Sequence, residues 1–330
     1  MAGQSSNIIS KGQMRRKNDV RKKGNTRSVR KNHNPSTWGV PEDICRELQI
    51  ANFSYSELTG EERDKEILKQ INRIKYDDKV VGTPERTTVW EEGWGENLAE
   101  LRKTHSLEAL MPRYFRKGQP FRLFQNFIHT DNYKFDFEIR RLIQRSYFEY
   151  YLSEYENIYE FGCGTGINLI ELSKQYPEKR LHGLDLTRSS VGILEILKSE
   201  FDINVMGRQW DFTNPDEGYH LEGNCAVYTI AALEQIGKQW EGFLDYLLRE
   251  KPSMVLHLEP VAEMYDENNL VDWLALEFHR KRHYLDGYYT KLLELEERGL
   301  IEILDAHRTY VGNLNDESYS LIVWRPIEAN

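Results

Sequence analysis

The chain has 330 residues, of which 39% are hydrophobic, enough to bury the core of one large domain or of a catalytic domain with an accessory region. This composition excludes collagen-like, disordered and disulfide-scaffold classes, and the three cysteines, Cys45, Cys163 and Cys225, form no C-x-x-C pair that would predict a zinc site. Because no apolar stretch is long enough to cross a bilayer, we expect a cytoplasmic protein without a membrane partner. The cysteine spacing likewise leads us to expect no metal.

Basic residues are concentrated at the start of the chain. The whole chain carries a formal charge of −9, whereas residues 1–34 contain ten Lys or Arg and one acid. This segment has almost no apolar side chains, so we expect a disordered basic tail. The tail is interpreted as a solvated extension, as a weak nucleic-acid contact through sequence-independent attraction to phosphates, or as a targeting peptide.

Residues 35–131 are expected to form a mainly helical accessory region that caps the active site. A helix is predicted at 60–75, where apolar residues recur at helical spacing. Aromatic and basic residues are interleaved between 113 and 127. Such residues either pack a small helical cap or stack on a base. The residues concerned are Arg113, Tyr114, Phe115, Arg116, Lys117, Phe121, Arg122, Phe124 and Phe127.

Short apolar runs alternate with helical stretches in residues 132–330, the predicted catalytic domain. This alternation is typical of α/β proteins with a parallel sheet. Strands are expected at 158–161, 180–184, 203–206, 226–230, 254–258, 301–310 and 318–324, the last two as a hairpin. Helices are expected at 135–151, 166–175, 189–200, 239–249, 268–284 and 287–298.

A glycine-rich turn follows the first of these strands, in the segment Glu160-Phe-Gly162-Cys163-Gly164-Thr-Gly166. Glycines are needed where the backbone turns sharply and a ligand approaches it closely. The spacing G-x-G-x-G differs from the dinucleotide pattern G-x-G-x-x-G. An anionic Glu160 would repel a pyrophosphate but suits a cationic ligand such as the sulfonium of S-adenosylmethionine.

This segment resembles motif I of the class I S-adenosylmethionine-dependent methyltransferases. The resemblance covers roughly residues 135–326. It implies a Rossmann-like seven-stranded, mostly parallel sheet with a C-terminal antiparallel hairpin, and S-adenosylmethionine as the cofactor. It also implies that the backbone of the glycine turn, including Cys163, contacts the cofactor.

Two later segments resemble further cofactor-binding elements of that family. Asp185 and Leu186 follow the second strand, where the resemblance implies a carboxylate that accepts hydrogen bonds from both ribose hydroxyls. Asp211 and Phe212 follow the third strand, where it implies an acidic side chain on the adenine amino group beside an apolar wall. Each carboxylate alone could instead be a strand-end or helix-capping residue.

Three residues are candidates for the chemistry of methyl transfer. Glu234 follows the fourth strand, in the segment Leu233-Glu234-Gln235-Ile236, where many small-molecule members read Leu-Glu-His-Ile. Gln235 cannot replace a histidine base, because an amide does not titrate. His257 and Glu259 alternate on the fifth strand, so both face the site or both are structural.

A pair of histidines, His279 and His283, lies four residues apart on the helix predicted at 268–284. This spacing permits a metal pair, but the glutamate that zinc hydrolases place after the first histidine is absent. Contact with a phosphate or carboxylate of the substrate, or a solvated helix face, are the alternatives.

We expect a methyltransferase acting on a small molecule, at a hydroxyl of a sugar, nucleotide-sugar or natural product. No Asn- or Asp-Pro-Pro-aromatic turn follows the fourth strand, and no Cys–Pro pair is present, which argues against methylation of nucleic-acid bases. The alternative is an RNA- or ribosome-directed methyltransferase that uses the basic tail. A noncatalytic adaptor and a dehydrogenase are less favoured.

Overall fold

The large sheet of the protein has seven strands in the order β6-β5-β4-β7-β8-β11-β9. The structure is a computed structural model that describes residues 54–111, 118–317 and 319–327. Neighbouring strands from β6 to β8 are parallel, and β11 is antiparallel to both β8 and β9. The expected Rossmann-like fold class is confirmed. The strands are β4 (Asn157–Phe161), β5 (Arg180–Asp185), β6 (Val205–Gln209), β7 (Cys225–Ile230), β8 (Met254–Glu259), β9 (Ile301–Arg308) and β11 (Ser320–Pro326).

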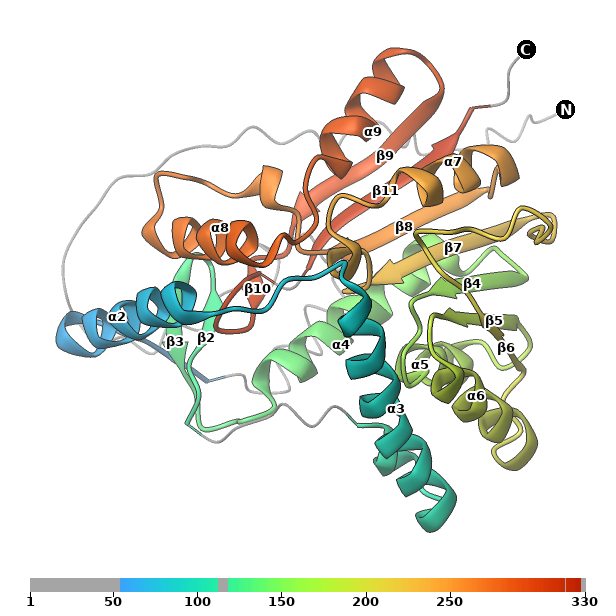
Figure 1. Cartoon of the computed structure of the whole chain (residues 1–330), viewed down its shortest axis with the longest axis horizontal. Coiled ribbons are helices and arrows are strands. Elements are labelled where there is room, and N and C mark those ends of the chain that lie inside the picture. Colours follow the sequence, from blue (N-terminus) through green and yellow to red (C-terminus); the bar gives the residue numbers. More distant parts are fainter. Residues whose placement is uncertain (1–53, 112–117, 318, 328–330) are drawn as a thin grey trace, which may run out of the picture.

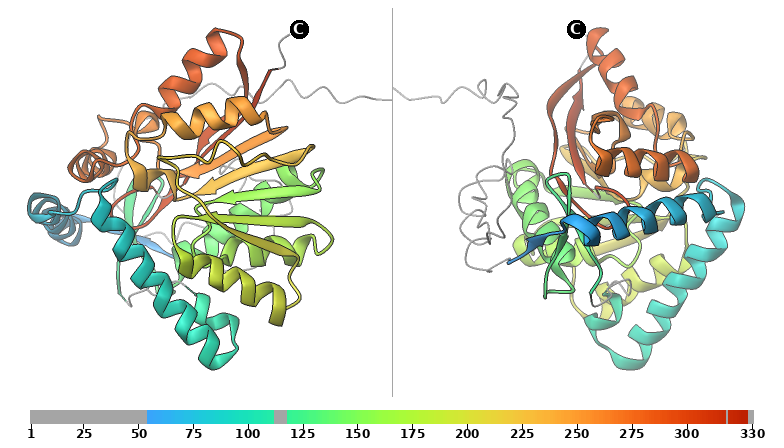
Figure 2. Two further views of the ribbon diagram at one scale, coloured as in Figure 1. Left: turned by 45° about the vertical axis from the view of Figure 1, so that its right-hand side comes forward. Right: turned by 90° about the vertical axis from the view of Figure 1, so that its left-hand side faces the viewer.

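Helices cover both faces of this sheet, so the fold has three layers (Figures 1 and 2). Successive strand residues point to opposite faces: Ile158 packs into one core with α4, α5 and α6, and Tyr159 into the other with α7 and α9. The central strands are therefore apolar along their whole length. The helices are α4 (Phe135–Tyr147), α5 (Ile167–Gln175), α6 (Arg188–Glu200), α7 (Glu241–Glu250) and α9 (Tyr288–Glu297).

The accessory region contains helices, as expected, and also a small antiparallel sheet. Its strands run in the order β1 (Ser56–Glu57), β3 (Asn126–His129), β2 (Phe121–Leu123) and β10 (Val311–Gly312). Phe121 and Phe127, two of the interleaved aromatic residues, therefore lie in strands. Because β10 comes from the C-terminal part of the chain, the two predicted regions share this sheet. Residues 113–117 and the basic tail 1–34 lie outside the described residues.

Two long helices precede the small sheet. The predicted helix at 60–75 is α2 (Gly60–Tyr76), whereas α3 (Pro84–Thr104) was not predicted. Helix α3 packs against α6, and α2 packs against α8 (Leu270–Arg282), as Figure 1 shows. Both contacts link the accessory region to the sheet domain, which places α3 beside the loops at the carboxyl ends of the strands.

Several boundaries differ from the prediction. Strand β6 begins and ends later than the predicted 203–206 because it lies at the sheet edge, where residues such as Arg208 are exposed and need not be apolar. The last two long strands pair antiparallel, as a hairpin would, but the chain between them forms β10 in the small sheet.

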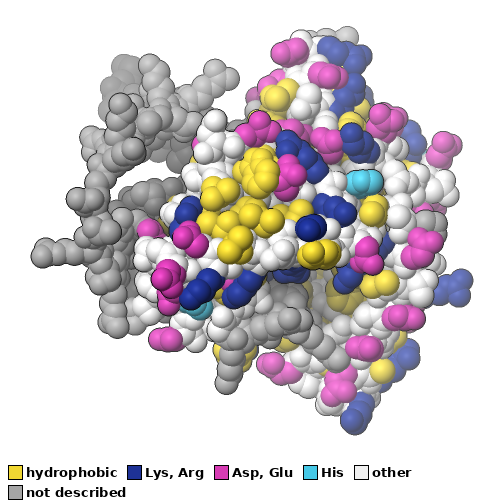
Figure 3. Space-filling view, turned by 60° about the vertical axis from the view of Figure 1, so that its left-hand side comes forward, with side chains coloured by type: hydrophobic (Ala, Val, Ile, Leu, Met, Phe, Trp, Pro, Cys, Tyr) yellow, Lys and Arg dark blue, Asp and Glu magenta, His cyan; other side chains and the backbone are white. Residues whose placement is uncertain are grey.

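No helix of the described residues is both long and apolar enough to span a membrane. The side of the molecule that carries α2 and α8 shows a group of apolar side chains at its surface (Figure 3). Exposed apolar residues on these helices are Leu68, Ile71, Tyr76, Leu270 and Trp273.

Candidate cofactor and acceptor site

The glycine turn lies where the chain order of the sheet reverses, between β4 and β7. Gly162, Gly164 and Gly166 have φ angles of 77°, 51° and 73°, which side chains other than glycine rarely adopt. A Cβ on Gly162 would lie 2.4 Å from the Cβ of Ala232, in the loop after β7. The turn therefore needs glycine for its conformation and for its close approach to the neighbouring loop, at the position where open α/β sheets bind ligands.

Glu160 lies beneath the turn, on the sheet face that packs against α5. Its side chain is fully buried, and its two oxygens accept hydrogen bonds from Asn168 Nδ2 at 2.6 Å and from the Tyr228 hydroxyl at 3.0 Å. Burial raises the pKa of Glu160 to about 8. Glu160, which was expected to face a cationic ligand, is therefore buried beneath the turn. Any electrostatic effect of its side chain on a sulfonium would act across the backbone of the turn. Cys163 is buried beside it.

Asp185 ends β5 and holds the glycine turn in place. Its Oδ2 accepts the backbone N–H of Gly164 at 2.8 Å, and its Oδ1 accepts the N–H and hydroxyl of Thr187 at 3.0 and 2.8 Å. Thr187 in turn caps α6. Leu186, between them, accepts a hydrogen bond through its carbonyl from Gln209 Nε2 at 2.9 Å. The structure brings both predicted residues next to the turn.

Asp211 and Phe212 form the loop after β6. The Phe212 ring would lie 3.4 Å from a Cβ on Gly162, so it lines the same space as the turn. Asp211 Oδ1 accepts the N–H and hydroxyl of Thr213, both at 2.8 Å. Phe212 is supported from behind by the ring of Phe243, with centroids 4.7 Å apart. The Phe212 ring therefore stands beside the glycine turn, and Asp211 precedes it in the same loop.

Helix α3 carries Arg86, Trp90 and Trp94 as a stripe of side chains that covers the site. These residues are four apart and share one helix face. Trp94 Cζ2 lies 3.0 Å from the Cβ position of Gly164, the two indoles stack with centroids 5.4 Å apart, and the Arg86 guanidinium lies 5.0 Å from the Trp90 ring. Arg86 Nη2 also donates to Gln235 Oε1 at 3.1 Å. This stripe was not predicted from the sequence, although the four-residue spacing of three large side chains was a usable signal.

Two contacts fix the accessory region against the glycine turn and the start of α6. The Glu91 carboxylate accepts the backbone N–H groups of Arg188 and Ser189, at 2.8 and 3.0 Å, at the start of α6. The hydrogen bond from the Ser189 hydroxyl is the largest cause of a lowered pKa for Glu91. On the other side, the hydroxyl of Thr165 in the glycine turn donates to the Leu110 carbonyl at 3.2 Å. The accessory region is therefore a fixed wall of the site.

His257 lies on β8, and its side chain is fully buried in the core. Its Nε2 accepts from Trp324 Nε1 at 3.1 Å and lies 2.8 Å from the Tyr288 hydroxyl, and its Nδ1 lies 2.8 Å from Thr229 Oγ1. Because indole can only donate, Nε2 is the unprotonated nitrogen and Nδ1 carries the proton. Burial lowers the pKa of His257 to about 3. This geometry favours a structural role for His257.

Glu259 is also fully buried, and its carboxylate caps the short helical turn η4 (Leu233–Ile236). It accepts the backbone N–H groups of Ala232 at 3.0 Å, Leu233 at 3.2 Å and Glu234 at 3.4 Å. Burial raises the pKa of Glu259 to about 7. These bonds occupy both oxygens, so the geometry assigns Glu259 to positioning η4.

Glu234, at the second position of η4, is only partly buried, unlike the other two candidates. Its Oε1 accepts a hydrogen bond from Gln235 Nε2 at 2.7 Å. Burial, followed by the charges of Asp316 and Glu259, raises the pKa of Glu234 well above its ordinary value. Asp316 comes from the loop between β10 and β11, which the sequence analysis interpreted only as a hairpin turn. Of the three candidates, Glu234 is the only one whose side chain is not fully buried.

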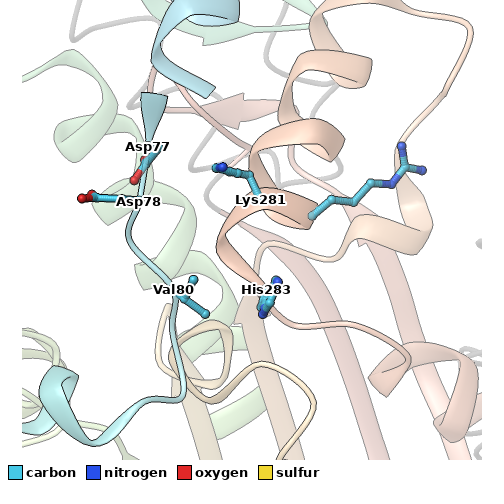
Figure 4. Close-up of a pocket in the computed structure, with 6 residues that line it drawn as sticks. Asp77, Asp78, Val80, Lys281 and His283 are labelled. Carbon is cyan, nitrogen blue, oxygen red and sulfur yellow. The ribbon is translucent and has the colours of Figure 1, made fainter. Parts of the chain in front are cut away.

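The histidines at 279 and 283 do not share a helix face. Helix α8 ends at Arg282, and His283 is its left-handed cap with φ of 56°. His279 is buried, whereas His283 lines a surface pocket of about 290 Å³ with Asp77, Asp78, Val80, Arg280 and Lys281 (Figure 4). Among the described residues, no three His, Cys, Asp or Glu side chains are arranged to hold a metal ion.

No family model and no curated protein matches the chain. Solved structures resemble it in part. An S-adenosylmethionine-dependent methyltransferase from Aquifex aeolicus is 15% identical over 55% of this chain and 86% of its own, with a TM-score of 0.38. The methyltransferase domain of bacterial CtHen1 is 16% identical over 58% of this chain and 99% of its own, with a TM-score of 0.42. The [4+2]-cyclase SpnF is 12% identical over 76% of this chain and 98% of its own, with a TM-score of 0.47. At these values the likenesses identify neither a reaction nor an acceptor.

Proposed function

We propose that this protein is a methyltransferase that transfers the methyl group of S-adenosylmethionine to a small-molecule acceptor. One observation carries the proposal: the glycine turn after β4 is hydrogen-bonded to Asp185 at the end of β5. This arrangement places the turn and a carboxylate side by side at the switch point of the sheet. The sequence resemblance to motif I of class I methyltransferases supports the same assignment.

The residues at the turn fit this cofactor. A Cβ on Gly162 would lie 2.4 Å from Ala232 Cβ, and one on Gly164 would lie 3.0 Å from Trp94, so glycine lets the backbone of the turn approach these side chains closely. Asp185 would accept hydrogen bonds from the ribose hydroxyls, and Asp211 from the adenine amino group, with Leu186 and Phe212 as the apolar wall. The bound cofactor supplies an electrophilic methyl group on a sulfonium.

A small acceptor is supported by the way the accessory region closes over η4. Gly82, in the link between α2 and α3, donates its N–H to the Gln235 carbonyl at 2.9 Å, and its carbonyl accepts from Gln239 Nε2 at 2.9 Å. Together with Trp94 over the turn, these contacts leave little room for a folded macromolecule. The acceptor would then lie between η4 and α3, next to Glu234.

The test is calorimetric titration of the protein with S-adenosylmethionine and, separately, with NADH, followed by incubation with methyl-labelled cofactor and a fractionated cell extract. We expect binding of the first ligand only and transfer of label to a low-molecular-weight product. Gly164→Val is the matched control, because a branched side chain would clash with Trp94 and the cofactor. Binding of NADH instead, or normal cofactor binding by Gly164→Val, would end the proposal.

The second candidate is methylation of RNA. It is favoured by the ten basic residues between positions 1 and 34, since such segments add salt-sensitive affinity for phosphates. In the labelling experiment, this candidate predicts that label enters material that ribonuclease degrades.

A further inference from the structure

Arg86, in the first turn of α3, is a cation with no carboxylate partner in the part of the chain that the structure describes. Its Nη2 donates to the neutral amide of Gln235 at 3.1 Å, and its Nε is buried without a hydrogen-bond partner among the described residues. The Trp90 ring, 5.0 Å from the guanidinium, attracts the cation without using its N–H donors. By contrast, the partly buried Arg282 is bound to the Asp77 carboxylate at 2.6 Å. Arg86 therefore keeps its charge and an N–H donor for a further partner.

Gln235 joins Arg86 to Glu234. The side-chain oxygen of Gln235 accepts from Arg86, and its amide nitrogen donates to Glu234 Oε1 at 2.7 Å. Its backbone carbonyl accepts the N–H of Gly82, in the link that leads into α3, at 2.9 Å. Because both ends of the amide are used, its orientation is fixed, and it holds the guanidinium and the carboxylate apart. A cation and the candidate base thus stand on either side of one amide at η4.

The aromatic stripe connects Arg86 with the glycine turn. The rings of Trp90 and Trp94 stack with centroids 5.4 Å apart, and Trp94 Cζ2 lies 3.0 Å from the Cβ position of Gly164. Residues 86 and 94 are two helical turns apart, about 12 Å along the helix axis. The side chains of the stripe, like that of Glu234, are partly exposed. The cation therefore stands at the η4 end of an aromatic wall whose other end covers the turn.

We propose that Arg86 binds an anionic group of the small-molecule acceptor, a carboxylate or a phosphate. This inference rests on the proposed methyltransferase function and adds the charge of its substrate. Arginine recognises both groups through N–H donors that lie in one plane. A neutral acceptor would leave the guanidinium without a counter-ion and its buried Nε without an acceptor, which costs free energy when the site closes over it. A cationic group at this position would be repelled.

The proposal also gives Gln235 a role. Many small-molecule members of the family that the sequence resembles have a histidine at this place. An amide accepts from Arg86 and donates to Glu234 at every pH, whereas a histidine loses its acceptor nitrogen when it is protonated. Gln235 therefore keeps the guanidinium in place without neutralising it. An acceptor held by its anion at Arg86 then lies along the two indoles, between η4 and the glycine turn.

The experiment uses the full chain, methyl-labelled S-adenosylmethionine and the low-molecular-weight fraction of a cell extract. The labelled product is purified, and its fragment ions in a mass spectrometer distinguish a carboxylate, a phosphate and a molecule with neither. We expect one of the two anionic groups. A labelled product with neither group overturns the anion and leaves the methyltransferase standing. No labelled product from any extract overturns the methyltransferase and this inference with it.

Variants test Arg86 once the acceptor has been purified. For Arg86→Gln we expect KM for the acceptor to rise at least about tenfold, because a charged hydrogen bond is lost, with an unchanged Kd for the cofactor and an unchanged melting temperature. Arg86→Lys keeps the charge without the planar donors and should have an intermediate KM. Arg102→Gln, at an exposed position of the same helix, is the matched control and should change none of these quantities. An unchanged KM in either Arg86 variant, with or without a lower melting temperature, overturns the assignment.

Discussion

Asp185 Oδ2 lies 2.8 Å from the backbone nitrogen of Gly164, so the end of β5 and the turn after β4 share one hydrogen bond. The residues are 21 positions apart in sequence, and parallel pairing of the two strands brings them together. The same carboxylate holds the loop that starts α6 through Thr187. Asp185 therefore sets the shape of the site and is also the group proposed to bind the ribose.

Replacing Asp185 by alanine should weaken S-adenosylmethionine binding by about 1–3 kcal/mol, because the ribose hydroxyls lose a charged acceptor. Calorimetry gives the Kd, and circular dichroism confirms that the variant is folded. Asp245→Ala, on the exposed side of α7, is the control and should bind normally. An unchanged Kd in a folded Asp185→Ala protein removes this residue from the ribose site.

Trp94→Ala should raise the Kd for the cofactor about tenfold, because the indole covers Gly164 and keeps water from that side of the turn. Titration calorimetry measures the change. Trp273→Ala removes an indole that is 40% exposed on α8 and should leave the Kd unchanged. Equal effects of the two substitutions would show that the contact with Gly164 does not contribute to binding.

His257→Asn and Glu234→Gln should have opposite phenotypes. The first should lower the free energy of unfolding by about 1–3 kcal/mol, because it disrupts the buried bonds to Trp324 and Tyr288, while the folded fraction keeps its rate. The second should lower the rate about 100-fold with little loss of stability. Urea unfolding measures the free energy of unfolding, and the rate of methyl transfer is measured at saturating cofactor. A stable His257→Asn protein with a 100-fold lower rate would assign His257 a catalytic role.

Glu160→Gln should stabilise the protein more at pH 8 than at pH 5. Burial raises the pKa of Glu160 from 4.5 to about 8, so its contribution to stability is fully present below pH 4.5 and is lost as the pH rises toward 8. The glutamine variant lacks this loss, and its advantage at pH 7 should approach about 3 kcal/mol. Urea unfolding of both proteins from pH 5 to pH 8 measures it, and a pH-independent difference would contradict the raised pKa.

Removing residues 1–34 should leave the melting temperature and the cofactor Kd nearly unchanged, because a charged segment with few apolar side chains adds little to a core. Calorimetry measures both quantities. RNA binding that falls steeply with salt and is abolished by the truncation would support the second candidate function. Loss of folding would show that the segment has a structural role.

The sequence by itself determined the fold class and the position of the glycine turn. Apolar runs mark β4, β5, β7 and β8 because these strands are buried on both faces. The turn can be recognised in the sequence because few residues other than glycine adopt its positive φ angles. The order of the carboxylates at positions 160, 185 and 211 follows from the same local patterns. Periodicity failed at the edge strand β6, where exposure removes the apolar signal.

Only the tertiary structure decided which candidate residues meet. His257, Glu259 and Glu234 are equally polar in the sequence, but packing encloses the first two and leaves Glu234 partly open. Trp94 reaches Gly164 from a helix 70 positions earlier, and the chain between β9 and β11 adds β10 to the small sheet of the accessory region. Such contacts depend on how helices and sheets pack, and local sequence patterns do not encode them because each pattern reports only the environment of its own element.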